Sequence, residues 1–315
     1  YNRRHHDSTN ACMLLIQPAN KRRKSTARVG LAIAGGGPIG GMYELGALRA
    51  LDDALEGLDL TRLEVYVGVS SGAFLAAGLA NRMTTEEMCR IFITGQDDRL
   101  RFNPDAFLRP AVFEYMRRAA GFPAMLMGWW RELLVNPGGA RISETIGRFS
   151  GLIPTGLFDN TEVERFLRDA FTIRGRSNDF RKLERPLYVV AVDLNSGDAV
   201  RFGRGEWSDV PISRAVQASA AMPGLYPPVQ IRDRHFVDGA LRRTMHASVA
   251  LNHGIDLLIG INPLVPFDSS TAPTMPDGLK NLADGGLPVV LSQMFRTLLQ
   301  SRAQVGIARY AQEFP

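Results

Sequence analysis

The chain has 315 residues, of which 45% are hydrophobic and 22% are charged, and its formal net charge is +5. This composition is typical of a globular protein long enough to bury a large core, and it favours one large α/β domain. The two cysteines, Cys12 and Cys89, are too few for a disulfide scaffold or a cysteine-rich metal site, and they fit a reducing compartment.

The positive charge is concentrated near the N-terminus. Residues 1–28 hold seven basic residues and one acidic residue, so they carry +6, and the other 287 residues together carry −1. We expect a basic flexible leader over residues 1–27. In this leader we interpret the KRRK run at 21–24 as a solvated linker, with anionic lipid or nucleic acid as the alternative contacts. No nucleic-acid partner is expected.

The longest apolar stretch, residues 65–80, approaches the length of a membrane span. It contains two serines and three glycines, which argues against a transmembrane helix. The chain opens at Tyr1 without the charged and apolar pattern of a signal peptide. We therefore expect a cytoplasmic or peripheral membrane protein, and the start at Tyr1 leaves secretion open.

The first predicted elements are a strand and a helix joined by glycines. Residues 28–34 (RVGLAIA) form a short apolar run bounded by glycines, which predicts a buried parallel strand. Residues 39–55 predict an amphipathic helix, because apolar residues recur there at intervals of three and four. Its apolar face consists of Met42, Leu45, Leu48, Leu51 and Leu55. Its charged face, expected to meet solvent, consists of Glu44, Arg49, Asp52 and Asp53.

The remaining elements predict an α/β fold, a three-layer α/β/α arrangement with a mostly parallel central sheet. Residues 63–68 (LEVYVG) form the next strand, and a β-α-β-α order requires right-handed crossovers with helices on both faces of the sheet. Strand patterns disappear over about 84–175, which predicts a helical insertion. Further strands are expected at 185–194, 198–203, 228–239 (a hairpin) and 256–263, before a C-terminal helical extension over about 279–315.

The first motif with chemical content is GVSSG at 68–72, which fits G-x-S-x-G between a predicted strand and a predicted helix. The serine, Ser70, would lie on a sharp strained turn at a helix N-terminus, which favours developing negative charge. Gly68 and Gly72 avoid the collisions that larger residues would make where the backbone doubles back. Ser70 is thus a candidate nucleophile, and the alternative is a small-residue turn without chemistry.

The second motif is GGGPIG at 35–40, one β-α unit earlier. Bare amides at a strand end can point at one anion, and acyl transfer needs two or more fixed N–H donors for its tetrahedral intermediate. Gly36 and Gly37 are the first candidates and Ile39 is the third, since Pro38 has no N–H. The same letters fit G-x-G-x-x-G, so a dinucleotide site is an alternative, although no acidic residue ends the next strand.

The third motif is VDGA at 237–240, which by itself is a common turn. It gains weight because a serine hydrolase needs a base, and histidine is the usual one. Five histidines occur, none within a recognisable motif: His5, His6, His235, His246 and His253. A Ser-His-Asp esterase built from Ser70, Asp193 and either His246 or His253 is an alternative, although only one β-α unit precedes Ser70.

GGGPIG, GVSSG and DGA, in this order and spacing, resemble the motifs of the patatin-like phospholipase family of bacterial type. The segment ASAAMPGLYPPV at 218–229 is similar to the A-S-x-A-x-P-x-x-Y/F-x-P segment that precedes the family's aspartate. The likeness covers about residues 28–262 and is weakest in the helical insertion. It implies a patatin-like phospholipase domain over residues 28–315.

The resemblance implies a Ser-Asp dyad without a catalytic histidine, with Ser70 as nucleophile and Asp238 as base in the motif Asp238-Gly239-Ala240. The implied oxyanion hole consists of Gly35, Gly36, Gly37, Ile39 and Gly40. The implied activity is that of a phospholipase A or a lysophospholipase-like lipid esterase, which acts on phospholipid or another acyl-ester lipid through an acyl-serine intermediate. No metal or nucleotide cofactor is implied, contact with a membrane surface is a further expectation, and the oligomeric state is not indicated.

Three further features carry expectations of their own. The family commonly has Arg or Lys where this chain has Ile39, which keeps the amide but removes a positive side chain that could contact a phosphate head group. Asp193 is expected to cap the adjacent turn rather than to act in catalysis. An apolar cluster is expected to form the core of the insertion, with a lipid-facing lip as the alternative. It comprises Phe122, Met125, Leu126, Met127, Trp129, Trp130, Leu133 and Leu134.

Overall fold

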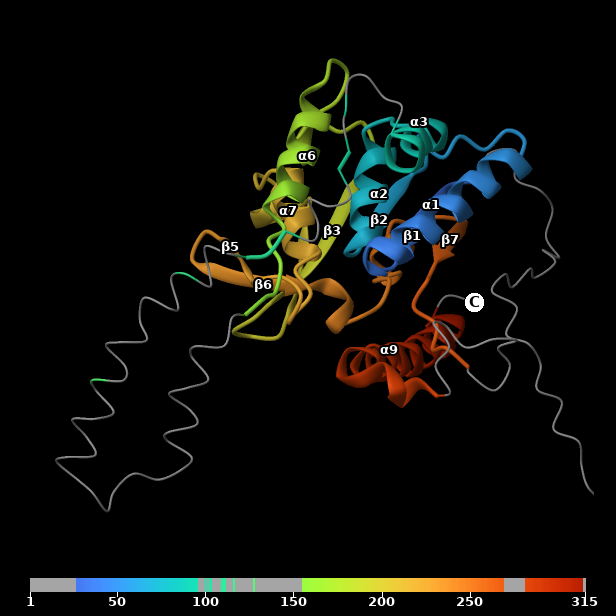
Figure 1. Ribbon diagram of the computed structural model, residues 1–315. Helices are drawn as coiled ribbons and strands as arrows, with labels where there is room; N and C mark the ends of the chain where they lie inside the picture. The colour runs from blue at the N-terminus through green and yellow to red at the C-terminus, as the bar shows by residue number, and fades with distance from the viewer. Residues whose placement is uncertain are drawn as a thin grey trace, which may run out of the picture.

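A computed structural model describes residues 27–95, 100, 102–103, 109–111, 116, 127, 155–268 and 281–313. Within these residues, one mixed sheet of seven strands forms the centre of the molecule (Figure 1). Its strands are β1 (Val29–Ile33), β2 (Val65–Gly68), β3 (Leu187–Asp193), β4 (Ala199–Phe202), β5 (Val229–Ile231), β6 (Arg234–Asp238) and β7 (Leu257–Ile261). Each strand expected from the sequence is present, including the hairpin of β5 and β6.

The centre of the sheet is parallel. The strand order is β5-β6-β3-β2-β1-β7, in which β7, β1, β2 and β3 run parallel to one another. Both β4 and β6 pair with β3 in the antiparallel sense. All residues of β2 and β3 are buried, as expected for strands covered on both faces.

The described helices are α1 (Gly37–Ala54), α2 (Ser71–Ala80), α3 (Thr85–Cys89), α6 (Thr161–Thr172), α7 (Ile212–Ser219), α8 (Ser248–Leu251) and α9 (Gly286–Glu313). A π-helical turn, η1 (Arg90–Thr94), continues α3. Short 3-10 turns occur at η3 (Phe180–Lys182), η4 (Gly205–Trp207), η5 (Gly239–Leu241) and η7 (Leu282–Gly285).

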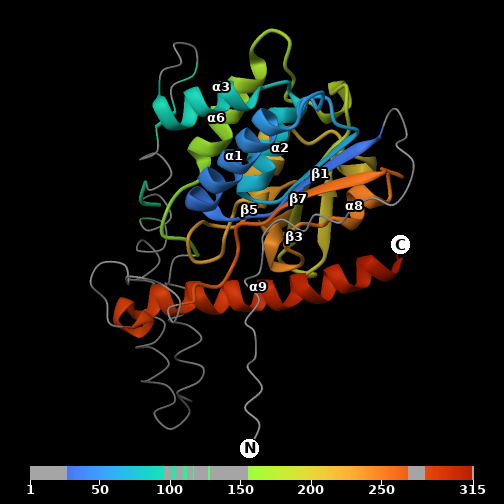
Figure 2. The same cartoon turned by 90° about the vertical axis from the view of Figure 1, so that its right-hand side faces the viewer.

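These helices cover the two faces of the sheet unequally. On one face, the larger apolar cluster joins α1, α2, α6 and α7 through residues such as Leu48, Leu79, Leu167 and Val216. On the other face, a smaller cluster contains Val249 of α8. Figure 2 shows α9 running along this second side, away from α1 and α2. The arrangement confirms the predicted three-layer α/β/α fold.

The prediction for α1 is nearly correct in extent, but it is wrong for the charged residue Glu44 and for the apolar residues Met42 and Leu55, which are both 42% exposed. Leu45 and Leu48 are buried as expected, whereas Glu44, expected to meet solvent, is fully buried. Its carboxyl group turns toward α2, where the Ser71 hydroxyl donates a hydrogen bond to Oε1 over 3.0 Å. A polar partner on the neighbouring helix therefore allows a carboxyl group to lie inside, which hydrophobic periodicity does not reveal.

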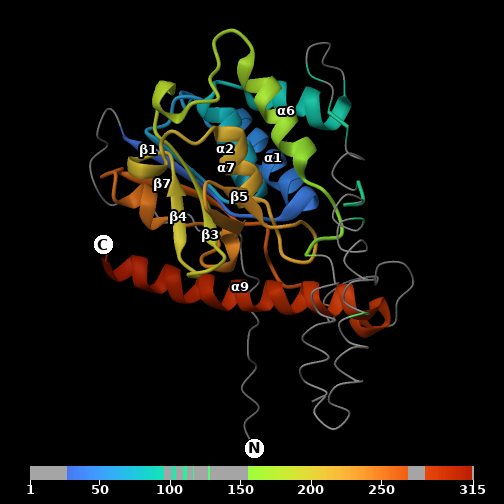
Figure 3. The ribbon, with the colours of Figure 1, turned by 90° about the vertical axis from the view of Figure 1, so that its left-hand side faces the viewer.

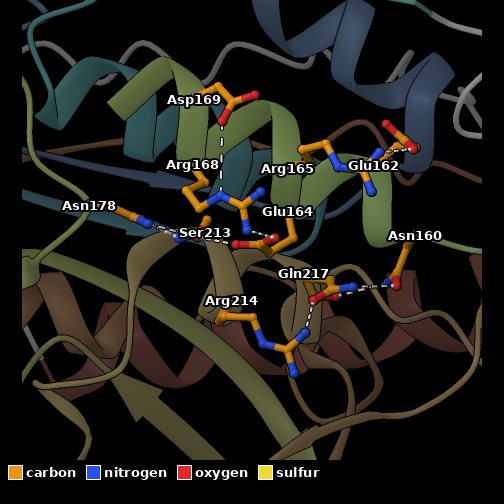
Figure 4. Close-up of polar contacts among 10 residues, drawn as sticks. All are labelled: Asn160, Glu162, Glu164, Arg165, Arg168, Asp169, Asn178, Ser213, Arg214 and Gln217. Atoms are coloured by element: carbon orange, nitrogen blue, oxygen red, sulfur yellow. Dashed lines mark hydrogen bonds and ion pairs between the residues drawn. The ribbon is translucent and has the colours of Figure 1, made fainter. Parts of the chain in front are cut away.

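Polar contacts attach α6 to α7 beside their apolar core (Figure 4). Glu164 Oε1 on α6 accepts from the Ser213 hydroxyl on α7 over 3.0 Å, and Asn160 Oδ1 accepts from Gln217 Nε2 over the same distance. The rest of the predicted insertion is described only in part. The apolar cluster predicted at 122–134 lies outside the described residues apart from Met127, whose side chain is exposed.

The C-terminal helical extension predicted over about 279–315 contains α9, which Figure 3 shows along one side of the molecule. Hydrogen bonds that join α9 to the domain include the Thr244 hydroxyl donating to Leu299 O over 3.4 Å and Arg302 Nη1 donating to Leu241 O over 3.0 Å. None of the helices in the described part of the chain combines the length and the apolar character needed to cross a bilayer. The predicted leader, except for residue 27, lies outside the described residues.

Candidate active site

The register of β3 brings the ends of two strands together. β4 pairs with residues 189–192 along one edge of β3. The other two partners of β3, which are β2 and β6, must therefore pair along its opposite edge. On that edge β2 ends where Gly68 pairs with Val189, and β6 ends where Asp238 pairs with Ala191. Because β2 is parallel and β6 antiparallel to β3, their last residues approach each other end to end. The segments that follow, with Ser70 and Gly239, therefore meet at one place.

Close packing confirms this meeting of β2 and β6. A Cβ atom on Gly239 would lie 2.1 Å from the Val190 carbonyl oxygen and 3.0 Å from Val69 Cγ1. No real side chain tolerates the first distance, so position 239 requires glycine for close approach rather than for a turn conformation. The D-G sequence therefore has a packing reason at this site.

Ser70 occupies the strained turn that the sequence predicts. Its backbone has φ 53° and ψ −121°, a region that non-glycine residues rarely adopt, and its side chain is buried. A Cβ on Gly68 would lie 2.4 Å from Ala73 Cα, and a Cβ on Gly72 would lie 2.3 Å from the Ala34 carbonyl oxygen. Residues 68–72, called the elbow below, thus form the sharp strand-to-helix turn that a nucleophile elbow requires.

A buried serine on α7 supports the elbow. The Ser219 hydroxyl accepts a hydrogen bond from the Ser70 amide over 2.8 Å and donates one to the Val190 carbonyl over 2.6 Å. The second contact places Ser219 between the ends of β2 and β6. A side chain with both a donor and an acceptor is needed here, because each neighbouring backbone group requires the opposite partner.

Asp238 presents one oxygen that is held and one that is unpaired. Oδ1 accepts from the Ala240 amide over 2.8 Å, whereas Oδ2 has no hydrogen-bond partner within the described part of the chain. The carboxyl group is fully buried, and this burial raises its pKa to about 6 against the opposing effects of the Ala240 amide and the Ser70 side chain. Ser70 is thus close enough to favour the charged carboxylate, although no hydrogen bond of normal geometry joins the two.

The glycine loop, residues 35–40, lies directly against the elbow. A Cβ on Gly35 would lie 2.8 Å from Ser70 Cβ, so a larger residue would displace the serine. The Gly36 amide donates to Ser71 Oγ over 2.8 Å, and the Gly40 amide donates to the Gly36 carbonyl over 3.0 Å. Both amides therefore already donate hydrogen bonds within the protein. This reduces the number of predicted amides that can donate to an oxyanion.

Of the three other predicted residues, Gly35 packs against Ser70, whereas Gly37 and Ile39 lie at the first turn of α1. Gly37, with φ +63°, and Ile39 both belong to this turn, where backbone amides have no acceptor within the helix. The Ile39 side chain is 84% exposed, so its amide lies beside solvent-facing apolar surface. These two amides fit the electrostatic demand of an oxyanion best.

Among the described residues, Asp193 and the histidines make no hydrogen bond to Ser70 or Asp238. Asp193 Oδ1 accepts from the amides of Asn195 and Ser196 over 2.9 and 3.3 Å, which confirms that it caps its turn. Burial acts to raise its pKa, but these amides and Arg234 outweigh burial, so the pKa is lowered. No contact joins Asp193 to a histidine among the described residues.

His246 and His253 have structural partners of their own. His246 Nε2 lies 3.4 Å from the Gly239 carbonyl oxygen, and burial is the main cause that lowers its pKa to about 4. His253 Nε2 lies 2.9 Å from the Tyr188 hydroxyl, near the start of β3 and away from Ser70. His235 lies exposed on the hairpin, and neither His5 nor His6 lies within the described residues. The geometry thus favours Asp238 as the base.

Candidate metal ligands do not gather in the described part of the chain. Within residues 27–95, 155–268 and 281–313, and the few described residues between them, no three His, Cys, Asp or Glu side chains are placed to hold one ion. Cys89 is a free thiol in this part of the chain.

A family model described as patatin-like phospholipase matches residues 31–251, which include the glycine loop, the elbow and the DGA turn. The chain belongs to the patatin-like phospholipase family. Membership confirms the fold class and supports a lipid acyl hydrolase.

Two similar curated proteins are themselves described as uncharacterized. An NTE family protein of Mycobacterium tuberculosis (strain CDC 1551 / Oshkosh) is 28% identical over 231 residues, which are 72% of this chain and 29% of that protein. A protein of Acanthamoeba polyphaga mimivirus is 24% identical over 232 residues, 73% of this chain and 64% of its own length. The chain therefore spans less than two thirds of each.

Solved structures with some likeness include two bacterial proteins. VipD from Legionella pneumophila has a TM-score of 0.36 and 18% sequence identity, covering 68% of this chain and 46% of VipD. The type III effector ExoU, from Pseudomonas aeruginosa, has a TM-score of 0.34 and 19% identity, covering 87% of this chain and 53% of ExoU.

Three residues of the site were not singled out from the sequence. Ser219 lies within the ASAAMPG segment, whose family resemblance was a signal, but its contacts with the elbow depend on the placement of α7. Ser71 stands beside the nucleophile as a second serine without a motif position. Glu44 was assigned to solvent, and only the approach of α1 to α2 reveals its contact with Ser71.

Proposed function

We propose that this protein is a serine acyl hydrolase in which Ser70 and Asp238 form a catalytic dyad. The observation that supports it most is the end-to-end meeting of β2 and β6, which sets a strained, buried serine beside a buried carboxyl group with one unpaired oxygen. The proposed substrates are glycerophospholipids or related acyl esters, in keeping with the family, and the product is a free fatty acid. Residues 28–315 would form the hydrolase domain, preceded by the leader at 1–27.

In the first half of the proposed reaction, Asp238 takes the proton of the Ser70 hydroxyl as its oxygen attacks the acyl carbon. The carbonyl oxygen becomes negatively charged, and the amides of Gly37 and Ile39 donate hydrogen bonds to it. The C–O bond to the alcohol then breaks, and the proton on Asp238 passes to the leaving oxygen. An ester between the acyl group and Ser70 remains.

In the second half, water attacks the acyl-Ser70 ester, and Asp238 takes a proton from this water. The same amides hold the second tetrahedral intermediate. When the intermediate collapses, Ser70 recovers its proton and the fatty acid leaves.

The pKa of Asp238 suits this role. An ordinary aspartate, with a pKa near 4, is a weak base toward a hydroxyl group. Burial raises the pKa of Asp238 to about 6, so the carboxylate is a stronger base and is still charged at neutral pH. Its unpaired Oδ2 leaves a lone pair for the Ser70 proton.

Exposed apolar side chains on the first turns of α1 support a lipid substrate. Ile39 is 84% exposed, and Met42 and Tyr43 on the next turn of α1 are 42% and 44% exposed. These side chains lie beside the proposed oxyanion donors, where an acyl chain would pass. We further propose that this rim touches a membrane surface during catalysis.

The test uses a soluble p-nitrophenyl ester together with a fluorophosphonate probe. Wild-type protein is expected to turn over the ester and to be labelled at Ser70, whereas Ser70→Ala loses both and keeps its circular dichroism spectrum. Ser248→Ala, on α8 at the other face of the sheet, is the control for labelling, since the probe should still react with Ser70 in that variant. Turnover that survives in Ser70→Ala, or labelling of another residue, would falsify the assignment.

Analysis of products from mixed phospholipid vesicles then tests the substrate class. Release of fatty acid by the wild type and none by Ser70→Ala is expected. A protein that binds vesicles but releases nothing, and that resists the probe, would instead be a silent lipid-binding module.

A further inference from the structure

Glu44 is a buried carboxyl group that the proposed reaction does not use. Its side chain is fully inaccessible to solvent, and Oε2 has no hydrogen-bond partner in the part of the chain that the structure describes. Charged side chains are rarely buried without a partner, so its position calls for a reason. The reason we find is its link, through one serine, to the glycine loop.

A chain of two hydrogen bonds joins three separate elements at this point. The Gly36 amide donates to Ser71 Oγ over 2.8 Å, and the Ser71 hydroxyl donates to Glu44 Oε1 over 3.0 Å. The hydroxyl has a single proton, so accepting from Gly36 and donating to Glu44 uses it in both directions. The glycine loop, the first residue of α2 and the middle of α1 are thereby fixed to one another.

Packing encloses this chain of hydrogen bonds. A Cβ on Gly36 would lie 2.5 Å from Pro263 Cγ and 3.3 Å from Glu44 Oε1, and a Cβ on Gly40 would lie 4.0 Å from the same oxygen. Pro263 therefore presses on the loop from the end of β7, while Glu44 lies on its inner side. The loop has little freedom to move away from the elbow.

We propose that Glu44 is a positioning residue for this hydrolase: through Ser71 it holds the Gly36 amide, and so aims the neighbouring Gly37 and Ile39 amides at the oxyanion. This inference rests on the proposed function, because it assigns Glu44 a task in the same oxyanion hole. Fixed donors stabilise an oxyanion best when no reorganisation is needed during the reaction.

The protonation state of Glu44 matters for this task. Burial raises the pKa of its carboxyl group well above the usual range, and the Ser71 hydrogen bond only partly opposes burial. Burial therefore favours the uncharged form of Glu44. An uncharged carboxyl group accepts the Ser71 proton through its carbonyl oxygen without placing a negative charge beside the developing oxyanion, where such a charge would oppose catalysis.

Two substitutions separate positioning from simple packing. Glu44→Gln keeps the uncharged acceptor and the size of the side chain, so kcat on the soluble ester is expected to stay within about 3-fold of wild type. Glu44→Leu keeps much of the volume but removes the acceptor. It is expected to lower kcat by about 10- to 100-fold with KM within about 2-fold. The affinity for a trifluoromethyl ketone, which forms an oxyanion on Ser70, should fall by the same factor as kcat/KM.

A double-mutant cycle and a matched control complete the design. Ser71→Ala breaks the same link, so adding Glu44→Leu to it should lower kcat little further, whereas independent effects would multiply. Glu164 on α6 is also buried and accepts from a serine hydroxyl over 3.0 Å, but it contacts α7 rather than the glycine loop. Glu164→Leu should lower the melting temperature and leave kcat of the folded protein unchanged.

Each outcome has a clear consequence. The inference is overturned if Glu44→Leu keeps wild-type kcat, or if Glu44→Gln and Glu44→Leu lower kcat equally. It is also overturned if the losses of kcat in Glu44→Leu and Ser71→Ala multiply in the double variant. If Glu44→Leu does not fold, Ser71→Ala decides, and a wild-type kcat in that variant overturns the inference. Failure of the proposed function is distinguishable, because Ser70→Ala would then retain turnover whatever Glu44 does.

Discussion

Asp238 and Glu44 are both buried carboxyl groups, and they lie beside two neighbouring serines of one turn, Ser70 and Ser71. Burial raises the pKa of both, and each has one oxygen without a hydrogen-bond partner among the described residues. They differ in what faces them. Ser71 donates its proton to Glu44, while the Ala240 amide holds one oxygen of Asp238 and leaves the other beside Ser70.

This difference shows how one physical cause gives two roles. An amide donor and a nearby hydroxyl both favour the charged form of Asp238, so its pKa stops at about 6 and it can serve as a base at neutral pH. Glu44 has a single hydroxyl donor against its burial, so burial dominates, raises its pKa well above the usual range and favours the uncharged form. The number and kind of donors around a buried carboxyl group, rather than burial itself, separate base from support.

The largest expected effect is that of Asp238→Asn on turnover. Asparagine keeps the size and the oxygen that accepts from the Ala240 amide but cannot take a proton from Ser70. We expect kcat for the soluble ester to fall by about 10²- to 10⁴-fold, the usual contribution of a general base. Steady-state kinetics beside Glu44→Gln, which should remain active, tests the comparison directly, and equal losses in both variants would remove the distinction drawn here.

The same substitution should raise stability at neutral pH. The folded-state pKa of Asp238, about 6, lies above the usual value of 3.8, so the folded protein binds this proton more tightly than the unfolded chain. Proton binding by Asp238 therefore stabilises the folded state relative to the unfolded state. This contribution is complete below about pH 4 and is lost as the pH rises through 6. Asp238→Asn cannot ionise, so it should be more stable than wild type by about 3 kcal/mol at pH 7.5.

Urea unfolding at pH 4 and pH 7.5 measures this difference. The advantage of Asp238→Asn should be small at pH 4 and full at pH 7.5. A pH-independent difference for Asp238→Asn would mean that its carboxyl group is not strained by burial.

How far the sequence predicts this site depends on the range of the interactions. The elbow follows from local geometry, since only small residues fit at Gly68 and Gly72, and the strands follow from apolar runs. Local geometry does not predict which amides are available to bind an oxyanion. The Gly36 amide, for example, donates its hydrogen bond to Ser71, which lies 35 residues along the chain. The burial of Glu44 is missed for the same reason: a helical pattern counts charges as outward, and the donor that compensates this one belongs to another helix.

Ser219→Ala should have an intermediate effect. It leaves the Ser70 amide and the Val190 carbonyl without their partner inside the protein, which is expected to cost about 1–3 kcal/mol of stability. Because the strained backbone of Ser70 then loses a restraint, kcat should also fall, by about 10-fold. Thermal unfolding and ester kinetics measure the two losses. Ser219→Thr keeps the hydroxyl and should recover part of the stability and part of kcat. An active and stable Ser219→Ala would show that the elbow keeps its conformation without Ser219.

The smallest effect is expected from the histidines, and it bears on the comparison because a triad would transfer the role of base from Asp238. His253 contacts the Tyr188 hydroxyl near the start of β3, and its pKa is lowered, first by burial and then by Arg204. His253→Gln can keep a hydrogen bond to Tyr188 and should leave kcat within about 2-fold of wild type. His246 is buried against the Gly239 carbonyl, so His246→Gln should lower stability more than kcat. A 10²-fold loss of kcat in either folded variant would assign the base to a histidine and would leave Asp238, like Glu44, as a support.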